Sequence, residues 1–166
     1  LALRLNPTPI GDLYITSDYL KDRQECYPLE LHLCCDCGLL QILKVIDPSL
    51  VYGKYLYRTS DHSGLVSHFK SYADELLERA NIPHGSLVID IGSNDGSFLS
   101  FFKAKGMKVL GIEPAKEIAE LAAKNGIETI HSFFDKNLAA RIKKEHGQAA
   151  IITSNNTFAN IDDLRG

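Results

Sequence analysis

The sequence predicts an α/β fold in which an open parallel sheet follows a small cysteine-bearing region. From residue 86 onward, short apolar runs alternate with amphipathic helical segments, which is typical of parallel strands joined by right-handed crossovers. The first apolar run ends in a glycine-containing turn, Gly92-Ser-Asn-Asp-Gly96, that opens the next helix. Residues 1–58 differ in composition, because they carry all four cysteines and four of the six prolines.

Three parts are expected along the 166 residues, a length that suits one domain with a small appendage. Residues 1–58 form the cysteine-bearing region, in which the alternating run 29–33 indicates a strand with one buried face. Residues 59–83 predict an amphipathic bridging helix that ends before Pro83. Residues 84–166 hold the parallel sheet.

Within residues 84–166, glycine and proline mark the element boundaries. Gly106 and Gly126 end the first two helices, and Pro114 opens the second one. The expected strands are 86–91, 107–113, 127–130 and 149–154, and the expected helices are 97–105, 114–125 and 137–145.

Composition and charge favour a small-molecule partner. Eighteen basic and twenty-one acidic residues leave a formal charge of -3, with no basic block of the kind that nucleic-acid binding requires. No apolar run approaches the roughly 20 residues that a membrane-spanning helix needs. The first residues show no secretory signal and the cysteines are clustered, so a reducing cytoplasm is expected. The missing initiator methionine predicts a piece of a longer protein.

The turn after the first strand predicts a binding site for a cationic cofactor. Ligands of parallel sheets lie at the carboxyl ends of the strands, where Gly92 permits close approach and Gly96 lets a helix start. Asp90 and Asp95 are expected to face a cation and would disfavour a pyrophosphate. Asn94 replaces the middle glycine of a dinucleotide fingerprint. The turn therefore favours S-adenosylmethionine, whose ammonium and sulfonium are positive; a tight turn with solvated carboxylates is the alternative.

Other predicted cofactor contacts follow the next three strands. Glu113 ends the second strand and is expected to accept hydrogen bonds from ribose hydroxyls, a role that nicotinamide proteins share. Phe133 and Phe134 would flank an adenine ring, unless they belong to the core. Asn155 would bring a polar amide to the same edge, although asparagine is also common in plain turns.

Residues before the bridging helix are candidates for a cap over the ligand. Tyr55, Tyr57, Thr59 and Ser60 enter the helix where it should cross the carboxyl edge of the sheet. Loops above such an edge carry ligand contacts, so these residues are expected to cover the cofactor or the substrate. The alternative is a tyrosine pair that packs two parts of the chain together.

Cys34 and Cys37 form a C-x-x-C knuckle followed by glycine, a spacing that lets two thiolates bind one zinc ion. Structural zinc usually takes four ligands, and Cys26 and His32 have irregular spacing as further candidates. Buried free thiols remain an alternative. A redox pair fits less well, because such pairs sit at a helix start and this one follows a strand.

The chain resembles the sugar C-methyltransferase family. The resemblance runs in order through nearly the whole chain, at Tyr27-Pro-Leu-Glu-Leu, Cys34-Cys-Asp-Cys-Gly-Leu, Tyr55-Leu-Tyr-Arg-Thr-Ser, His68-Phe, Tyr72-Ala, Asp90-Ile-Gly-Ser-Asn-Asp-Gly, Gly111-Ile-Glu-Pro-Ala, Gly126-Ile-Glu-Thr, Phe133-Phe and Asn155-Asn-Thr-Phe-Ala-Asn-Ile-Asp-Asp. It implies a Rossmann-like class I methyltransferase sheet that binds S-adenosylmethionine, a structural zinc in the N-terminal region, and C-methylation of a nucleotide-linked keto-deoxysugar.

The same resemblance implies that the family continues on both sides of these residues. An earlier cysteine pair would complete the zinc site, so zinc is expected in the full-length protein and little or none in this chain. The remaining strands, the catalytic base and the sugar-binding domain would follow the fourth strand, so this chain alone is expected to be poorly active.

Two other functions compete with a methyltransferase. A nicotinamide-dependent oxidoreductase would share the fold and Glu113, but the missing middle glycine argues against it. The second alternative is a non-catalytic zinc-ribbon interaction module joined to a nucleotide-binding fold.

Overall fold

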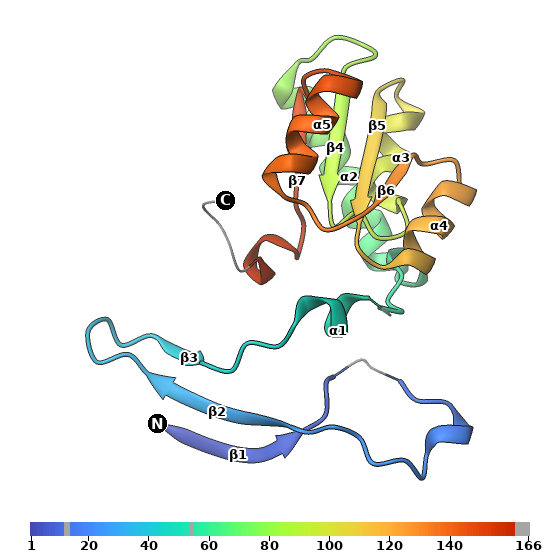
Figure 1. The fold of residues 1–166 in the computed structure, drawn as a ribbon. Helices are drawn as coiled ribbons and strands as arrows, with labels where there is room; N and C mark the ends of the chain where they lie inside the picture. Colours follow the sequence, from blue (N-terminus) through green and yellow to red (C-terminus); the bar gives the residue numbers. More distant parts are fainter. Residues whose placement is uncertain (12–13, 54, 162–166) are drawn as a thin grey trace. The chain divides into compact units, whose positions relative to one another are not determined.

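Two separate sheets organise the chain in a computed structural model that describes residues 1–11, 14–53 and 55–161. An antiparallel sheet of three strands belongs to an N-terminal unit, Leu1–Tyr55, and a parallel sheet of four strands belongs to a C-terminal unit, Leu56–Gly166 (Figure 1). Each unit has its own internal packing and is described by itself.

The N-terminal unit pairs β1 (Leu3–Thr8), β2 (Tyr27–Leu33) and β3 (Leu40–Ile42) in that spatial order. A short 3-10 turn, η1 (Ser17–Tyr19), lies between β1 and β2, and α1 (Pro48–Tyr52) follows β3. Helix α1 starts where the Asp47 carboxylate accepts a hydrogen bond of 2.8 Å from the backbone N–H of Ser49, with Pro48 in the first turn.

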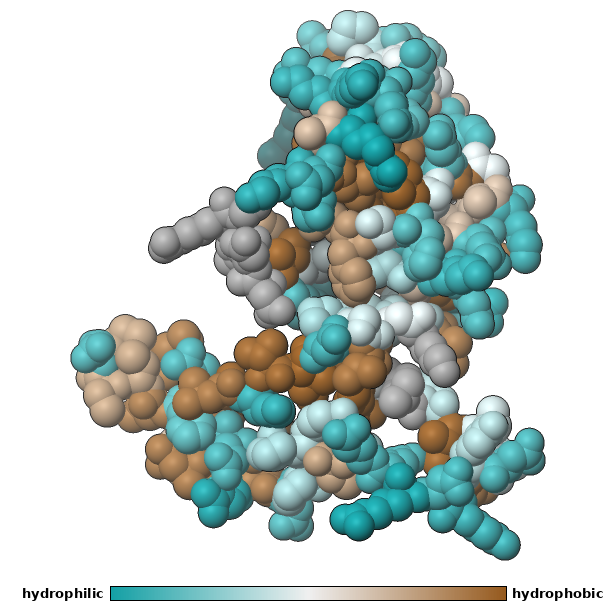
Figure 2. Space-filling model, viewed as in Figure 1, coloured by the Kyte–Doolittle hydropathy of each residue, from teal (hydrophilic) through white to brown (hydrophobic). Residues whose placement is uncertain are grey.

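The antiparallel sheet has one apolar and one polar face. Leu3 pairs with Leu31 and Leu31 with Ile42, and directly opposed residues share a face of a sheet. By this register the apolar face consists of Leu3, Leu5, Leu29, Leu31, Leu33, Leu40 and Ile42. The opposite face carries the ion pair between Arg4 and Glu30, at 2.7 Å. Five residues of the apolar face are exposed, and Figure 2 shows hydrophobic residues, in brown, at the surface of this unit.

The C-terminal unit contains the predicted parallel sheet, and the fold class is confirmed. Its strands are β4 (Leu87–Ile91), β5 (Lys108–Glu113), β6 (Thr129–His131) and β7 (Ile151–Thr153), in the spatial order β6-β5-β4-β7. The helices are α2 (Ser63–Ala80), α3 (Ser97–Ala104), α4 (Lys116–Lys124) and α5 (Lys136–His146), with 3-10 turns η2 (Thr59–Asp61) and η3 (Phe158–Asn160). Asn81 ends the bridging helix α2 in the left-handed conformation, where it supplies a backbone cap to Leu77.

Both faces of the two central strands, β4 and β5, are buried, which explains why these strands are apolar without alternation. Ile152 of the edge strand β7 is 60% exposed. Val88 of β4 faces a core of helices α2, α3 and α4, while its neighbours Leu87 and Ile89 face a second core beside α5. Aromatic side chains join α2 to α3, with 4.7 Å between the ring centroids of Phe69 and Phe98. Helix α5 lies on the opposite side of the sheet from α2 (Figure 1). Within the described ranges, no helix combines the length and apolarity needed to span a bilayer.

Candidate cofactor site

Two glycines shape the turn between β4 and α3. Gly92 and Gly96 both have positive φ angles, +74° and +77°, which side chains rarely adopt. A Cβ at Gly92 would collide with the side chain of Thr157, and one at Gly96 would come within 2.9 Å of the side chain of Ile127. The turn is therefore packed against the loop after β7 on one side and against the residues before β6 on the other.

Glu113 ties the end of β5 to this turn. Its side chain is 5% exposed, and its two oxygens accept hydrogen bonds of 2.9 Å from the backbone N–H groups of Asn94 and Ala115. Burial raises the pKa of Glu113 above its usual value, and these hydrogen bonds oppose the rise. Because a carboxylate oxygen has two lone pairs, each oxygen can accept one further hydrogen bond.

Asp90 lies beside Glu113 and is also buried, at 3% exposure. The hydroxyl of Thr153 on β7 donates a hydrogen bond of 2.7 Å to its Oδ1 atom. Burial raises the pKa of Asp90 to about 7; the Thr153 hydrogen bond opposes the rise and the charge of Glu113 adds to it. Adjacent strand ends thus carry two buried carboxyl groups, and the described residues form no salt bridge with either one. The charge of His131 is a minor influence that lowers the pKa of Glu113.

Asn94 and Asp95 direct their side chains to residues 57–60. The Asn94 amide accepts a hydrogen bond from the backbone N–H of Thr59 at 2.8 Å and donates one to the carbonyl of Tyr57 at 2.9 Å. Asp95 accepts from the backbone N–H of Ser60 at 2.8 Å and from that of Ser97 at 3.1 Å. Burial of Asp95 opposes ionisation, but the hydrogen bonds from Ser97 and Ser60 outweigh it and lower its pKa.

The predicted cap residues fall into both units. The Tyr57 ring stacks on His62, with 4.8 Å between the ring centroids and 15° between the planes. Thr59 is buried and Ser60 is exposed. Tyr55 belongs to the N-terminal unit, where its ring meets the ring of Tyr52 edge-on at 6.0 Å. The structure therefore brings three of the four residues next to the turn between β4 and α3.

The remaining predicted contacts differ in exposure. Phe133 is 47% exposed, whereas Phe134 packs against the core beside α5. The Nδ2 atom of Asn155 is buried and has no hydrogen-bond partner among the described residues, as is also true of Ser93 Oγ and Ser154 Oγ. Buried polar atoms are usually satisfied, so three unpaired ones after the ends of β4 and β7 indicate a place for a polar ligand or water.

Thr153 and Thr157 were not predicted from the sequence. Thr153 holds Asp90, and Thr157 fills the space that the absence of a side chain at Gly92 leaves open. Thr153 ends β7 and Thr157 lies in the loop after it, and a threonine at either kind of position carries no local sign of such a contact in the sequence.

The cysteine knuckle is a tight turn between β2 and β3. The backbone N–H of Cys34 donates to the carbonyl of Leu39 at 2.9 Å, and that of Gly38 donates to the carbonyl of Cys34 at 3.0 Å. Hydrogen bonds from the backbone N–H groups of Cys37 and Asp36, and from the Cys37 thiol, lower the pKa of Cys34. In the part of the chain that is described, no three potential metal ligands gather, so Cys34 and Cys37 stand as a predicted half-site.

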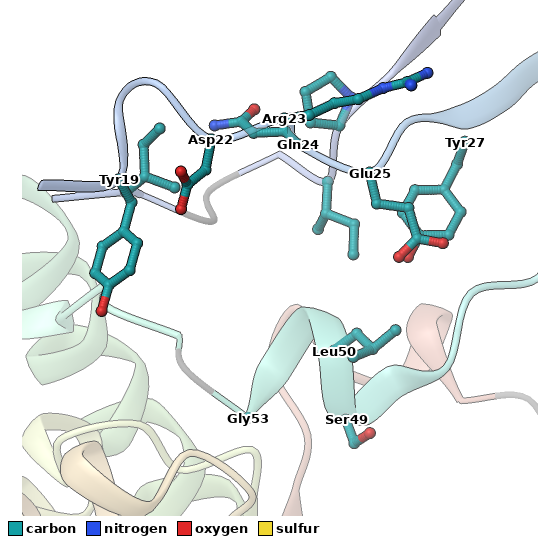
Figure 3. Close-up of a pocket in the computed structure, with 12 residues that line it drawn as sticks. Tyr19, Asp22, Arg23, Gln24, Glu25, Tyr27, Ser49, Leu50 and Gly53 are labelled. Carbon is teal, nitrogen blue, oxygen red and sulfur yellow. The ribbon is translucent and has the colours of Figure 1, made fainter.

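A hollow of about 600 Å³ lies within the N-terminal unit (Figure 3). Tyr19 and Tyr27 line it together with the charged residues Asp22, Arg23 and Glu25. It contains none of the predicted site residues, and its mixture of acidic and basic groups selects no ligand class.

Comparison with known proteins confirms the prediction of a methyltransferase domain. A family model described as "Methyltransferase domain" matches residues 66–166, and one described as "Putative zinc binding domain" matches residues 1–52. The C-methyltransferase NovU of Streptomyces niveus is 33% identical, in a match that covers 96% of this chain and 39% of NovU. The chain thus spans well under half the length of this curated relative.

Solved methyltransferase structures match smaller parts of the chain. The magnesium protoporphyrin IX methyltransferase from Synechocystis PCC 6803, with bound S-adenosylmethionine, is 20% identical with a TM-score of 0.38, over 42% of this chain and 38% of that one. Coclaurine N-methyltransferase, bound to N-methylheliamine and S-adenosylhomocysteine, is 22% identical with a TM-score of 0.35, over 51% of this chain and 28% of that one.

Proposed function

We propose a function from one premise, which is that this chain belongs to the methyltransferase domain family. We infer that its C-terminal unit binds S-adenosylmethionine at the carboxyl ends of β4, β5 and β7. The observation that carries the proposal is the pair of buried carboxyl groups, Asp90 and Glu113, at adjacent strand ends. Two such groups form a site for a ligand that is positively charged and rich in hydroxyl groups.

The residues present fit this cofactor. A cation beside Asp90 would favour its ionised form and so offset the cost of its burial. Glu113 retains lone pairs for two ribose hydroxyls, although both its oxygens already accept backbone hydrogen bonds. A pyrophosphate would bring negative charge to these carboxyl groups, which argues against a dinucleotide cofactor.

The other predicted residues would complete the site. Gly92 and Gly96 keep the turn close to the ligand, and Asn155 would use its unpaired Nδ2 atom on it. Phe133 is exposed enough to stack on the adenine, with Phe134 anchored behind it in the core. The remaining assignments are a ligand-shaping role for Asn94 and Asp95 and a capping role for Tyr55, Tyr57, Thr59 and Ser60.

We further propose C-methylation of a nucleotide-linked keto-deoxysugar by the complete protein. The resemblance to the sugar C-methyltransferase family and the similarity to the C-methyltransferase NovU support this. In such a reaction a base takes the proton from a carbon beside a ketone, and the cofactor supplies the methyl group to that carbon when bound. In this reaction, the residues of this chain would hold the methyl donor in line with the acceptor carbon.

A structural zinc in the complete protein is part of the same proposal. We assign residues 1–58 to the zinc-binding-type region, residues 59–83 to the bridge and residues 84–166 to cofactor binding. The backbone hydrogen bonds at Cys34 favour its thiolate, the form that binds zinc. Reduced cysteines fit the cytoplasm as the compartment.

Calorimetric titration with S-adenosylhomocysteine tests the cofactor assignment. Glu113→Gln should weaken binding by about 1–3 kcal/mol, because the amide replaces one accepting oxygen by a donor. Glu117→Gln is the matched control, since Glu117 is exposed on α4, and it should leave binding unchanged. Equal affinity of the Glu113 variant and wild type would rule out the ribose assignment. Binding of NADH in place of S-adenosylhomocysteine would support an oxidoreductase.

A further inference from the structure

We propose that Asn94 and Asp95 are positioning residues, which fasten residues 57–60 to the cofactor turn and couple the closure of that segment to cofactor binding. We call these two side chains and residues 57–60 the latch. Its existence follows from contacts within the C-terminal unit. Its coupling to the cofactor rests on the proposed function.

The hydrogen bonds of Asn94 explain why asparagine suits this position better than aspartate or serine. Its amide accepts from the N–H of Thr59 and donates to the carbonyl of Tyr57, so it binds the segment as a peptide group of a neighbouring strand would. Aspartate would lack the donor, and serine would lack the reach for both bonds. The residue also has a φ of 50°, a left-handed conformation that asparagine tolerates better than most side chains.

Asp95 joins the same segment to the start of α3. One carboxylate oxygen accepts from the N–H of Ser97 in the first turn of α3, and the other accepts from the N–H of Ser60 in η2. Asp95 itself is 2% exposed, so the accepting carboxylate has little access to water, and both hydrogen bonds are at least partly buried. The start of α3 and the segment before α2 are therefore held by one side chain.

A continuous set of hydrogen bonds leads from the proposed ribose contact to the latch. Glu113 accepts from the backbone N–H of Asn94, whose side chain binds residues 57 and 59. A ligand that binds Glu113 and settles on the turn would fix Asn94 in the conformation that holds Thr59. By thermodynamic linkage, a closed latch would in turn raise the affinity for that ligand. The stacked rings of Tyr57 and His62 would then be presented beside the site.

Cleavage by trypsin after Arg58 reports directly on the latch. Arg58 is exposed and lies inside the segment, and its ion pair with Asp61 is a weak surface contact of 3.5 Å. Cleavage requires the segment to open, so the rate follows the open population. Asn94→Gly keeps the left-handed backbone accessible but removes both side-chain hydrogen bonds. It should speed cleavage after Arg58 on the order of tenfold.

Asn81→Gly is the matched control. Asn81 has a φ of 44°, and its side chain makes no hydrogen bond to the residues that the structure describes, so the variant carries the same backbone change without losing a contact. Its cleavage rate after Arg58 should equal that of wild type. Cleavage after Arg141, within α5, should be unchanged in both variants, because it reports unfolding of the unit as a whole.

Asp95→Ser provides a second, independent opening of the latch. Serine can still accept from Ser97 but is too short to reach Ser60, so cleavage after Arg58 should again increase. If Asn94→Gly also accelerates cleavage after Arg141, the Asp95 variant decides. Unchanged cleavage after Arg58 in a folded Asn94→Gly or Asp95→Ser protein overturns the latch.

Addition of S-adenosylhomocysteine tests the coupling. It should slow cleavage after Arg58 in wild type severalfold and have a smaller effect in Asn94→Gly at saturating ligand. Equal protection of both proteins would refute the coupling while leaving the latch intact. Calorimetry on wild type distinguishes this outcome from a failure of the proposed function. If wild type binds no S-adenosylhomocysteine, the proposed function fails. The difference in cleavage after Arg58 between ligand-free wild type and ligand-free Asn94→Gly still tests the latch in that case.

Discussion

Asp90→Asn should make the stability of the C-terminal unit less sensitive to rising pH. The wild-type carboxyl group has a folded-state pKa of about 7, against an ordinary value of 3.8. Between these two values the unfolded chain releases the proton and the folded protein keeps it, so wild-type stability falls as pH rises and levels off above pH 7. Asparagine keeps a carbonyl oxygen for the Thr153 hydroxyl and has no proton to lose.

The size of this effect follows from the same two pKa values. Each unit of pH between them costs the folded wild type about 1.4 kcal/mol. Between pH 4.5 and pH 8 the free energy of unfolding of the variant, relative to wild type, should therefore rise by about 3 kcal/mol. Because Asp90 is almost fully buried, screening by solvent should reduce this value little.

Urea unfolding followed by far-ultraviolet circular dichroism, at pH 4.5, 6 and 8, measures the difference. Glu117→Gln, which removes an exposed carboxyl group from α4, should follow wild type at all three values. Parallel pH dependences for Asp90→Asn and wild type would mean that Asp90 is ionised throughout, and the explanation based on burial would be wrong.

Two further outcomes are expected. Gly92→Ala should lower the free energy of unfolding by about 1–3 kcal/mol in chemical denaturation, because the new Cβ meets Thr157 and the backbone has a positive φ; Thr157→Ala in the same chain should recover part of the loss, and no recovery would contradict the packing argument. Atomic absorption should detect little zinc in this chain and a full equivalent in a longer protein that supplies a second cysteine pair to Cys34 and Cys37, whereas a full equivalent in this chain would show that residues within it complete the site.

The sheet was largely predictable because its signals are local. Residues 86–91 and 107–113 were expected as strands and form β4 and β5 within one residue at each end, since apolar runs bounded by glycine or proline mark buried strands clearly. β1 was not predicted, because Pro7 interrupts its short sequence. In the structure all six of its residues are exposed. Its strand character depends on pairing with β2, a partner more than twenty residues away.

The position of the candidate site could be predicted from the sequence, but the contacts of its side chains could not. Gly92 and Glu113 could be located from their places after successive strands, because parallel strand ends share an edge. The side-chain partners of Asn94 lie 35 to 37 residues earlier, and the partner of Asp90 lies 63 residues later. Separations of this length carry no periodicity in the sequence, so only the folded chain reveals which groups each side chain contacts.

The knuckle between β2 and β3 also determines which face of the antiparallel sheet is apolar. Gly38 has a φ of +75°, and the turn that it closes sets Leu33 opposite Leu40 and Leu31 opposite Ile42. Side chains alternate along a strand, so lengthening or shortening this turn by one residue would rotate Leu40 and Ile42 to the side of Arg4 and Glu30. One insertion between Cys34 and Cys37 would thus change the spacing of the two thiols and also move Leu40 and Ile42 to the polar face. The thiol spacing and the apolar face of the sheet therefore both depend on the length of this loop.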